Sequence, residues 1–590
     1  MITHSTSALT FDPVTLEVIQ NGLESLVDEM ALTVMRTAHS GIVKDAMDYS
    51  TAFCDREGRV ISQGLTIVLH LGSFPDAMAA VRDIYEGDIA EGDVFILNDP
   101  YGSGGTHLPD IYVIKPIFAV GALQGFCGVV AHHADVGGIV PGSNSTDSTE
   151  IYQEGIRIPA LKLFERGKPN RTLFSIIEKN VRIPAEVLGD LRAQLAAAGI
   201  GERAYINLVE RYGALAMHRY TDEILDYSER IARQEISALP DGNYKFSDHV
   251  DADNIVEGPV LIKVAVGISG DQMTVDFEGT SEQVPAGINS PLPFSKAAVF
   301  GAVRLLFRQA IPNAVGFNRP IEVRAPLGTV LNPVSPAPCG ARGITGFRAM
   351  DAVLGALAQA APDRVPADGE GGNSLISIGG YDGEGKPFSY VDLFCGARGG
   401  MPSGDGPEGV PHPGANIAST PVEIAELEEP VRIEKYEMVQ DSGGAGRFRG
   451  ALAQVRSVRC LADQATLQVR SDKRHHPPYG LHGGRPGTPS TNILRSGGRE
   501  ELLKTLANCP IARGDLFVHT LAGGGGWGDP LDRSPEDVLR DVRDEKVSID
   551  YARREYGVVL DPSGYSVDES VTTRLRTEMR LRARRAKGAE

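Results

Sequence analysis

The sequence has few cysteines and no long apolar run. Its six cysteines lie far apart in 590 residues and no CxxC pair occurs, so neither a thiolate zinc site nor a disulfide framework is expected, and a reducing compartment fits. No apolar run approaches the roughly 18 residues that a membrane-spanning helix needs. A signal peptide begins with Lys or Arg followed by an apolar core, and the N-terminal residues show no such pattern. We therefore expect a cytoplasmic protein.

Basic residues are also in deficit. Lys and Arg number 58 against 77 Asp and Glu, which gives a net charge of −19 at pH 7. Nucleic acids and anionic membranes are bound through basic surfaces, so we expect neither as the main partner. The hydrophobic fraction of 42% is ordinary for a globular protein. A chain of this length exceeds what one core usually supports, so about two to four domains are expected.

Signatures of several common enzyme classes are missing. No GxxxxGK[ST] phosphate-binding loop occurs, and the GxGxxG match at 523–528 is followed at once by Asp529-Pro530, where a helix should open. Glycines of this kind more readily serve turns and close backbone approach, so this chain is not expected to be the main binder of ATP. No Gly-x-Ser-x-Gly motif occurs and no cysteine adjoins a histidine. The sequence therefore gives no support for a nucleophilic serine or cysteine mechanism, although a catalytic triad can be assembled from residues far apart in the sequence.

Apolar spacing and glycine content divide the chain into three regions, which together predict a multidomain α+β fold. Residues 1–240 combine short strands with amphipathic helices, 241–367 mix strands and helices, and 368–590 are rich in glycine with strand-length apolar runs. The chain closes in a helical, arginine-rich tail, which is typical of a solvated helix face or a frayed end. We assign metal binding and catalysis to the first region, for the reasons that follow.

The beginning of the chain predicts a helix followed by a hairpin. Asp12-Pro13 favours a helix start, because Asp is a common N-cap and Pro a common first residue. Apolar residues then recur at spacings of three and four to about Ala38, which favours core packing, with a subunit interface as the alternative. Segments 51–54 and 59–62 predict a tight hairpin. Asp48 lies just before it, where it could cap backbone amides or reach into a site.

Residues 93–138 contain the densest set of groups able to bind a metal. A predicted strand at Val94–Leu97 ends at a turn signal, and a glycine-rich loop with His107 follows. Segments 111–118 and 126–132 are predicted to pair as a hairpin, which places Asp110 roughly opposite His132 or His133. Cross-strand neighbours have Cβ atoms about 4.5–5.5 Å apart. We therefore predict that His107, Asp110 and His132 converge on one metal ion.

This ligand set has a catalytic and a structural interpretation. Two imidazoles and a carboxylate are typical of open catalytic sites for Zn, Mn or Fe, and such an ion can lower the pKa of bound water to about 7. Alternatively His107 caps a loop, His132 is a buried histidine with satisfied hydrogen bonds, and Asp110 binds backbone amides. Successive strand residues point to opposite faces, so only one of His132 and His133 should face the ion.

Other candidate residues lie in loops. The loop after the histidine pair offers Asp135, Glu154 and Arg157, each of which could equally be a solvated or ion-paired side chain. A later loop rich in proline and glycine carries three more histidines, which we interpret as a surface loop before a contact to substrate or partner, and last as a second metal site. These are His475, His476 and His482.

Long motifs along the chain are recognisable. They include NDPYGSGGTHLPDIYVIKPIF, VVAHHADVGGIVPG and YQEGIRIPALKL, with DAMDYSTAFCDREGRVISQG before them and GGGGWGDPLDRSPEDVLRDVRD near the end. Together, over nearly the whole chain, they resemble the hydantoinase B/oxoprolinase family, whose relatives include subunits of acetone and acetophenone carboxylases. The resemblance implies one divalent metal ion, most readily Zn with Mn or Fe as alternatives. It matches the family's ligands to Asp48, His107, Asp110 and His132.

The resemblance also implies a partner and a reaction. A hydantoinase A-type subunit would bind ATP and Mg and phosphorylate an oxygen of the substrate, and metal-bound water would then open the activated ring amide of hydantoin, 5-oxoproline or a related lactam. The assembly would be a hetero-oligomer such as α2β2. Asp135, Glu154 and His133 are the candidates for orienting ligands or moving a proton.

Two other functions stay open. One is a subunit of an ATP-dependent ketone carboxylase of the acetone or acetophenone type, in which an enol phosphate attacks CO2. The other is a scaffold whose ion is structural, and such a site would be closed by four protein ligands.

Overall fold

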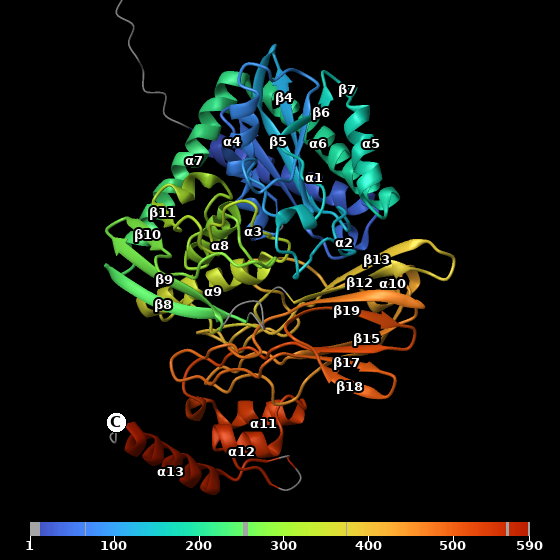
Figure 1. Ribbon diagram of the computed structural model, residues 1–590. Helices are drawn as coiled ribbons and strands as arrows, with labels where there is room; N and C mark the ends of the chain where they lie inside the picture. Colours follow the sequence, from blue (N-terminus) through green and yellow to red (C-terminus); the bar gives the residue numbers. More distant parts are fainter. Residues whose placement is uncertain are drawn as a thin grey trace, which may run out of the picture.

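The computed structural model describes residues 12–64, 67–251, 258–372, 374–561, 564 and 566–587. The N-terminal segment that bears on a signal peptide therefore lies mostly outside the described residues. Strands of the first region form one sheet with helices on both faces, a second, smaller sheet lies beside it, and two further sheets and a helical end follow (Figure 1). Mixed helices and several antiparallel sheets confirm the predicted multidomain α+β class.

The first sheet is antiparallel and seven-stranded, in the order β2-β1-β5-β4-β3-β6-β7. Its two faces pack into separate cores: Phe53 and Val129 contact the cluster that contains α1 and α6, while Tyr112 packs with Phe74 of α4. The two faces receive different residues because successive side chains along a strand point to opposite sides of the sheet. The strands are β1 (Tyr49–Asp55), β2 (Val60–Gln63), β3 (Val94–Leu97), β4 (Asp110–Ala119), β5 (Ala122–His132), β6 (Leu161–Glu165) and β7 (Lys168–Pro169).

The hairpin predicted in this sheet is present, and its register is the one expected. β4 and β5 pair antiparallel from the Ala119↔Ala122 pair to the Asp110↔His132 pair. The predicted hairpin at 51–62 is also confirmed as β1 and β2. Each strand begins or ends within a few residues of its predicted bounds, so the sequence pattern determined the local pairing.

Helices cover this sheet. The Asp12 carboxylate accepts a hydrogen bond from the Thr15 amide at 3.0 Å, which confirms the predicted N-cap of α1. The stripe of apolar residues along α1 is buried against the sheet and α6. The helices of this region are α1 (Pro13–Thr37), α2 (Gly41–Lys44), α3 (Val68–Leu71), α4 (Phe74–Ile84), η1 (Ile151–Gln153), α5 (Arg171–Asn180), α6 (Pro184–Tyr212) and α7 (Ala214–Ser237).

The second sheet has the order β11-β10-β9-β8, and the buried helix α9 packs against β8 and β9. This helix begins at Gly343 and has a second glycine, Gly346, in its first turn. Glycine weakens a helix when considered locally. Here a Cβ at Gly346 would lie 2.3 Å from the Phe294 ring, so close packing with α8 requires glycine inside the helix. The elements are β8 (Gly242–Val250), β9 (Val260–Ser269), β10 (Gln272–Asp276), α8 (Leu292–Arg304), η2 (Val315–Asn318), β11 (Ile321–Arg324) and α9 (Gly343–Ala360).

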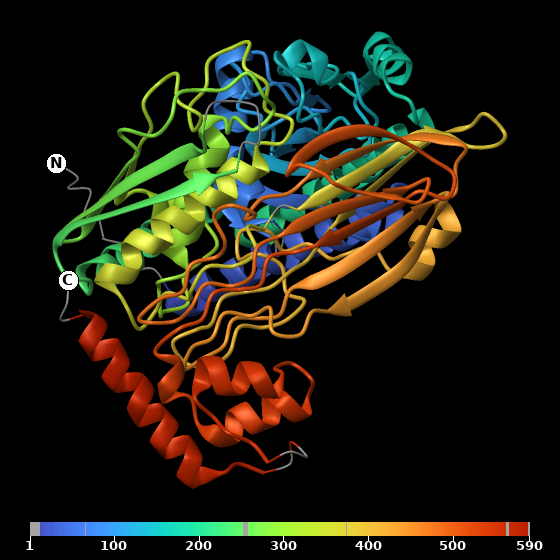
Figure 2. The same cartoon turned by 60° about the horizontal axis from the view of Figure 1, so that its bottom comes forward.

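The glycine-rich region contains two more sheets, β13-β12-β16-β19 and β14-β15-β20-β17-β18, which share an apolar core (Figure 2). Helices α11, α12 and α13 lie at the outer end, below these sheets in Figure 1. The elements are β12 (Leu375–Tyr381), β13 (Pro387–Leu393), α10 (Val422–Glu428), β14 (Val431–Met438), β15 (Gln454–Cys460), β16 (Gln464–Arg470), β17 (Thr491–Ser496), β18 (Arg499–Leu502), β19 (Leu506–Ala512), β20 (Leu516–Thr520), η3 (Pro530–Asp532), α11 (Pro535–Arg543), α12 (Ile549–Tyr556) and α13 (Glu569–Lys587).

The glycine clusters form neither helices nor strands. Gly523 to Gly526 run as an extended segment inside a bundle of other extended segments. The amides of Gly524, Gly525 and Gly526 donate to the carbonyls of three different segments, at Ala451, Asp368 and Arg485. A Cβ at each of these glycines would lie 1.9–2.2 Å from a neighbouring carbonyl oxygen, as at Gly524, where the Arg398 oxygen would be 2.1 Å away. Close backbone approach, as predicted, explains the glycines.

Within the described part of the chain, no helix has the length and apolar character needed to span a membrane. All six cysteines are free thiols.

Candidate metal centre

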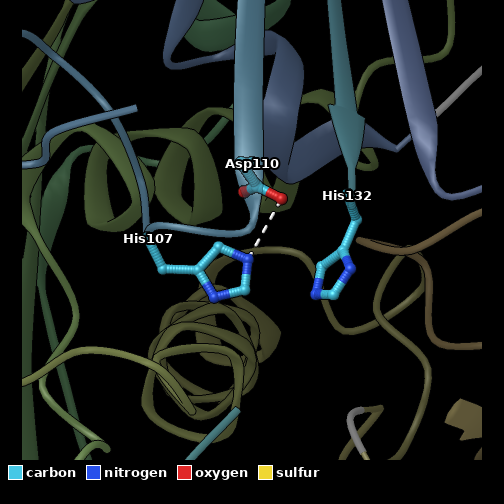
Figure 3. A group of neighbouring side chains, drawn as sticks. All are labelled: His107, Asp110 and His132. Atoms are coloured by element: carbon cyan, nitrogen blue, oxygen red, sulfur yellow. Dashed lines mark hydrogen bonds and ion pairs between the residues drawn. The ribbon is translucent and has the colours of Figure 1, made fainter. Parts of the chain in front are cut away.

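Three ligand-bearing side chains meet at one end of the β4–β5 hairpin. Asp110 is the first residue of β4 and His132 the last of β5, directly paired, and His107 lies three residues before Asp110 in the preceding loop. One donor atom from each lies within 4.8 Å of the others, and all three residues are buried. Figure 3 shows the two imidazoles and the carboxylate turned toward a common space. The structure thus brings together the three predicted ligands.

The environment of His107 fixes which nitrogen faces this space. Its Nδ1 lies 3.0 Å from the Gly340 carbonyl oxygen, which only accepts, so Nδ1 carries the proton. Burial lowers the pKa of His107 to about 4, so the ring is neutral and Nε2 presents a lone pair. This nitrogen faces an Asp110 carboxylate oxygen at 3.1 Å. Two electron-rich atoms at that distance fit a shared cation.

Asp48 lies beside the three residues. It immediately precedes β1, and its backbone oxygen accepts a hydrogen bond from the His132 amide at 2.9 Å. Burial, together with the negative charge of Asp110, raises the pKa of Asp48 to about 8. Its Oδ1 and the Nδ1 of His132 are buried without a hydrogen-bond partner among the described residues. Orphaned polar atoms are costly in a protein interior, and a cation would satisfy this carboxylate.

Sequence reasoning missed His70, which lies on the short helix α3. Its Nε2 is 3.4 Å from Asp110 Oδ2 and 3.7 Å from Asp48 Oδ1, and burial lowers its pKa to about 4. A lone histidine in the apolar run VLHL was the available signal. His70 therefore belongs to the same buried cluster as the predicted ligands.

Two arginines from the other regions complete the surroundings. Arg342, at the N-terminus of α9, donates to Asp110 Oδ2 and lies over the Phe294 ring at 4.3 Å. Its positive charge holds the pKa of Asp110 well below the usual range despite burial. Arg470 is the last residue of β16. Its positive charge opposes the rise in the pKa of Asp48 that burial causes, and adds to the lowering of the His132 pKa by burial. The site therefore lies where all three regions meet.

Glu154 acts on the cluster through the backbone. Its carboxylate accepts hydrogen bonds from the amides of Cys339 at 3.0 Å and Gly340 at 2.7 Å. The carbonyl oxygen of the same Gly340 accepts the hydrogen bond from His107 Nδ1. Burial raises the pKa of Glu154 to about 8. Glu154 thus positions the loop that orients His107.

We expect Glu154→Gln to weaken metal binding without abolishing it. One amide would lose its acceptor, the loop would shift, and the orientation of His107 would relax. Loss of such an outer hydrogen bond typically lowers metal affinity about 10–100-fold. Competition with a chromophoric chelator measures this, and an affinity equal to that of the unmodified protein would argue against a positioning role.

The other two predicted proton-transfer residues are not placed beside the cluster. His133 Nε2 lies 3.0 Å from Gln194 Oε1 of α6, on the opposite face of the strand end from His132. Asp135 forms an ion pair with Arg182 at 2.8 Å and accepts from the Arg182 amide. Both arrangements correspond to ordinary buried or ion-paired side chains. Arg157 likewise pairs with Asp99 at 2.9 Å.

The histidines of the later loop do not assemble into a second site. His476 Nδ1 lies 2.9 Å from Asp251 Oδ1 and its ring stacks on His249, whereas His482 packs against Trp527. Among the described residues, His107, Asp110 and His132 are the single set of three with metal-ligand spacing.

Known proteins share both the sequence and the fold. Residues 12–530 match the family described as Hydantoinase B/oxoprolinase. The chain is 33% identical to the B component of the putative D-/L-hydantoinase of Pseudomonas sp. (strain NS671), over 96% of this chain and 98% of that protein. It is 34% identical to the beta component of the caprolactamase of Pseudomonas jessenii, over 95% of this chain and 98% of that protein.

Two solved structures have the same architecture. The crystal structure of ATP-dependent caprolactamase from Pseudomonas jessenii superposes with a TM-score of 0.89 at 33% identity, covering 96% of this chain and 100% of that chain. A nucleotide-free acetone carboxylase superposes with a TM-score of 0.91 at 21% identity, covering 98% of this chain and 84% of that chain. The second likeness concerns the fold alone.

Proposed function

Because this chain belongs to the hydantoinase B/oxoprolinase family, we propose that it is the metal-binding subunit of an ATP-dependent cyclic-amide hydrolase. Its substrate would be a hydantoin, 5-oxoproline or a related lactam. The observation that carries the proposal is the arrangement of His107, whose Nε2 lone pair faces the Asp110 carboxylate at 3.1 Å beside His132. Relatives named as parts of a hydantoinase and of a caprolactamase support the substrate class.

The residues fit one divalent ion. His107, Asp110 and His132 would hold it. Asp48 would be a fourth ligand, since its Oδ1 accepts no hydrogen bond among the described residues and lies 3.7 Å from His70 Nε2. A mixed imidazole and carboxylate set suits Zn best, with Mn or Fe as alternatives. A bound ion would supply Lewis acidity and lower the pKa of water in the site.

The protein's own residues prepare this site for hydrolysis. Arg342 keeps Asp110 ionised, and the bond from His107 to Gly340 directs Nε2 inward. The cluster is fully buried, which keeps bulk water from an activated intermediate. His70 Nε2 lies within 3.4 Å and 3.7 Å of the two carboxylates, so it is the group best placed to hold or pass a proton there.

ATP and Mg are assigned to a partner. The chain has no phosphate-binding loop motif, while the related caprolactamase is described as ATP-dependent and two relatives are named as single components of larger enzymes. We therefore assign nucleotide binding to a hydantoinase A-type ATPase subunit, in a hetero-oligomer such as α2β2.

The alternative function is a subunit of an ATP-dependent ketone carboxylase, which the fold of acetone carboxylase favours. The test combines purified chain and ATPase subunit with ATP and a panel of hydantoin, 5-oxoproline, caprolactam, acetone and acetophenone, with and without bicarbonate. We expect ADP release coupled to ring opening that does not depend on bicarbonate. ADP release only when a ketone and bicarbonate are both present would establish the carboxylase. If no substrate is turned over and the chain unfolds when the metal is removed, the ion is structural.

A further inference from the structure

Arg470 and Arg342 are buried arginines that reach the metal cluster from different regions. Arg342 is 5% exposed and begins α9, while Arg470 is 3% exposed and ends β16. Burial, helped by the positive charge of Arg342, lowers the pKa of Arg470 to about 9. The backbone also brings the two arginines together: Asn144, which accepts a hydrogen bond from Arg470, precedes Ser145, and the Ser145 carbonyl oxygen lies 3.3 Å from the Cβ position of Gly340, two residues before Arg342.

Arg470 lacks the partner that a buried arginine normally has. Its Nη1 donates to Asn144 Oδ1 at 3.2 Å, and no carboxylate of the described residues lies within ion-pairing distance of its guanidinium. The Nε atoms of both Arg470 and Arg342 are buried without a hydrogen-bond partner among the described residues. By contrast, equally buried arginines elsewhere lie within 3.2 Å of a carboxylate. These are Arg348, Arg449 and Arg456.

A count of formal charges shows what the site lacks. With Asp48 ionised as a ligand, Asp48 and Asp110 balance the charges of Arg342 and Arg470, so a bound divalent ion would leave two positive charges uncompensated in a buried space. Uncompensated buried charge is strongly unfavourable. A ligand that carries two negative charges restores the balance, whereas one carboxylate restores half of it.

We infer that Arg342 and Arg470 form a binding site for a phosphate-type dianion carried by the reactant, next to the metal ion. Guanidinium groups bind phosphate through paired N–H donors. Arg342 also stands at the N-terminus of the 18-residue helix α9, where the helix dipole favours an anion. The inference rests on the proposed function, since it names the form in which the activated substrate reaches this chain.

The two arginines have distinct tasks in this arrangement. Arg342 already donates to Asp110 and lies over the Phe294 ring. It therefore holds Asp110, a predicted metal ligand, in place and would also bind the anion. Arg470 has no bond to the predicted ligands, which makes it the residue to change without disturbing the metal. Because it comes from β16, an anion bound to both arginines would connect the glycine-rich region to the helix α9.

The experiment measures inorganic phosphate binding to the metal-loaded full chain by isothermal titration calorimetry, with acetate as the monoanion. We expect phosphate to bind more tightly than acetate, and Arg470→Gln to weaken phosphate binding at least about tenfold, which corresponds to loss of one charge-assisted bond pair. Arg470→Lys should fall between the two. Metal content, measured by plasma mass spectrometry, should be the same in all three proteins.

Arg304→Gln is the matched control. Arg304 is half-buried and has no carboxylate within ion-pairing distance among the described residues, but it lies at the end of α8 with its guanidinium over Phe317. This variant should bind phosphate like the unmodified chain. Unchanged phosphate affinity in a folded, metal-loaded Arg470→Gln protein would overturn the inference, as would equal affinity of the unmodified chain for acetate and phosphate.

Failure of the proposed function has a different signature. A chain that binds no divalent ion would refute the metal site itself. Phosphate bound by the ion-free chain, and lost in Arg470→Gln, would still support the anion site in that case.

Discussion

Replacing His107 with alanine is expected to strip the metal ion from the protein and abolish turnover of the reconstituted enzyme. The imidazole presents its lone pair at 3.1 Å from Asp110 and is held there by the Gly340 carbonyl. Loss of a ligand should cost more than the about 10–100-fold in affinity that loss of an outer hydrogen bond costs. Plasma mass spectrometry of the purified variant measures the ion, and ADP release with ring-opened product measures turnover.

His133→Ala provides a matched control from the same strand end. This histidine is as buried as His107, but its ring bonds to Gln194 of α6. Its removal leaves a cavity and an unpaired amide, so the apparent Tm should fall while the metal stays bound. If His107→Ala instead retains one ion per chain, His107 is not a ligand. If it loses the ion and also fails to fold, a structural ion is favoured over a catalytic one.

Gly524→Ala is expected to destabilise the glycine-rich region strongly. The added methyl group would lie 2.1 Å from the Arg398 carbonyl oxygen and 2.6 Å from its carbon, and neither is the end of a flexible side chain. Such overpacking costs about 3 kcal/mol or more. In a folding unit of about 200 residues this corresponds to a fall in Tm of about 6–12 °C. Differential scanning calorimetry should show the shift in the transition of this region.

Gly383→Ala is the corresponding control. Gly383 is exposed in the turn between β12 and β13, and a Cβ there would meet no atom within 4 Å. Its transition should stay within about 1–2 °C of the unmodified protein, as for an ordinary surface change. Equal melting of the two variants would show that the extended segments can separate, and that their close contact does not require glycine.

The sequence predicts much of this protein where the deciding interactions are local. The Asp12 cap and the 3–4 spacing of apolar residues predict α1, and alternation with turn signals predicts the β4–β5 hairpin. In a hairpin, the position of the turn determines which residues of the two strands pair, so the sequence alone could place Asp110 roughly opposite His132 or His133. The choice of His132 over His133 came from the family resemblance, and the structure places the two rings on opposite sides.

Tertiary structure alone decides the surroundings of the cluster. His70, Arg342 and Arg470 come from α3, α9 and β16, and no periodicity relates positions so far apart in the chain. Packing also gives Glu154 its place under the 339–340 loop and makes Gly346 compatible with a buried helix. The sequence by itself determined which side chains could bind a metal and how a hairpin aligns them. Only the folded chain decided which charges surround them, because burial and proximity, which set pKa values and charge balance, arise from contacts between distant segments.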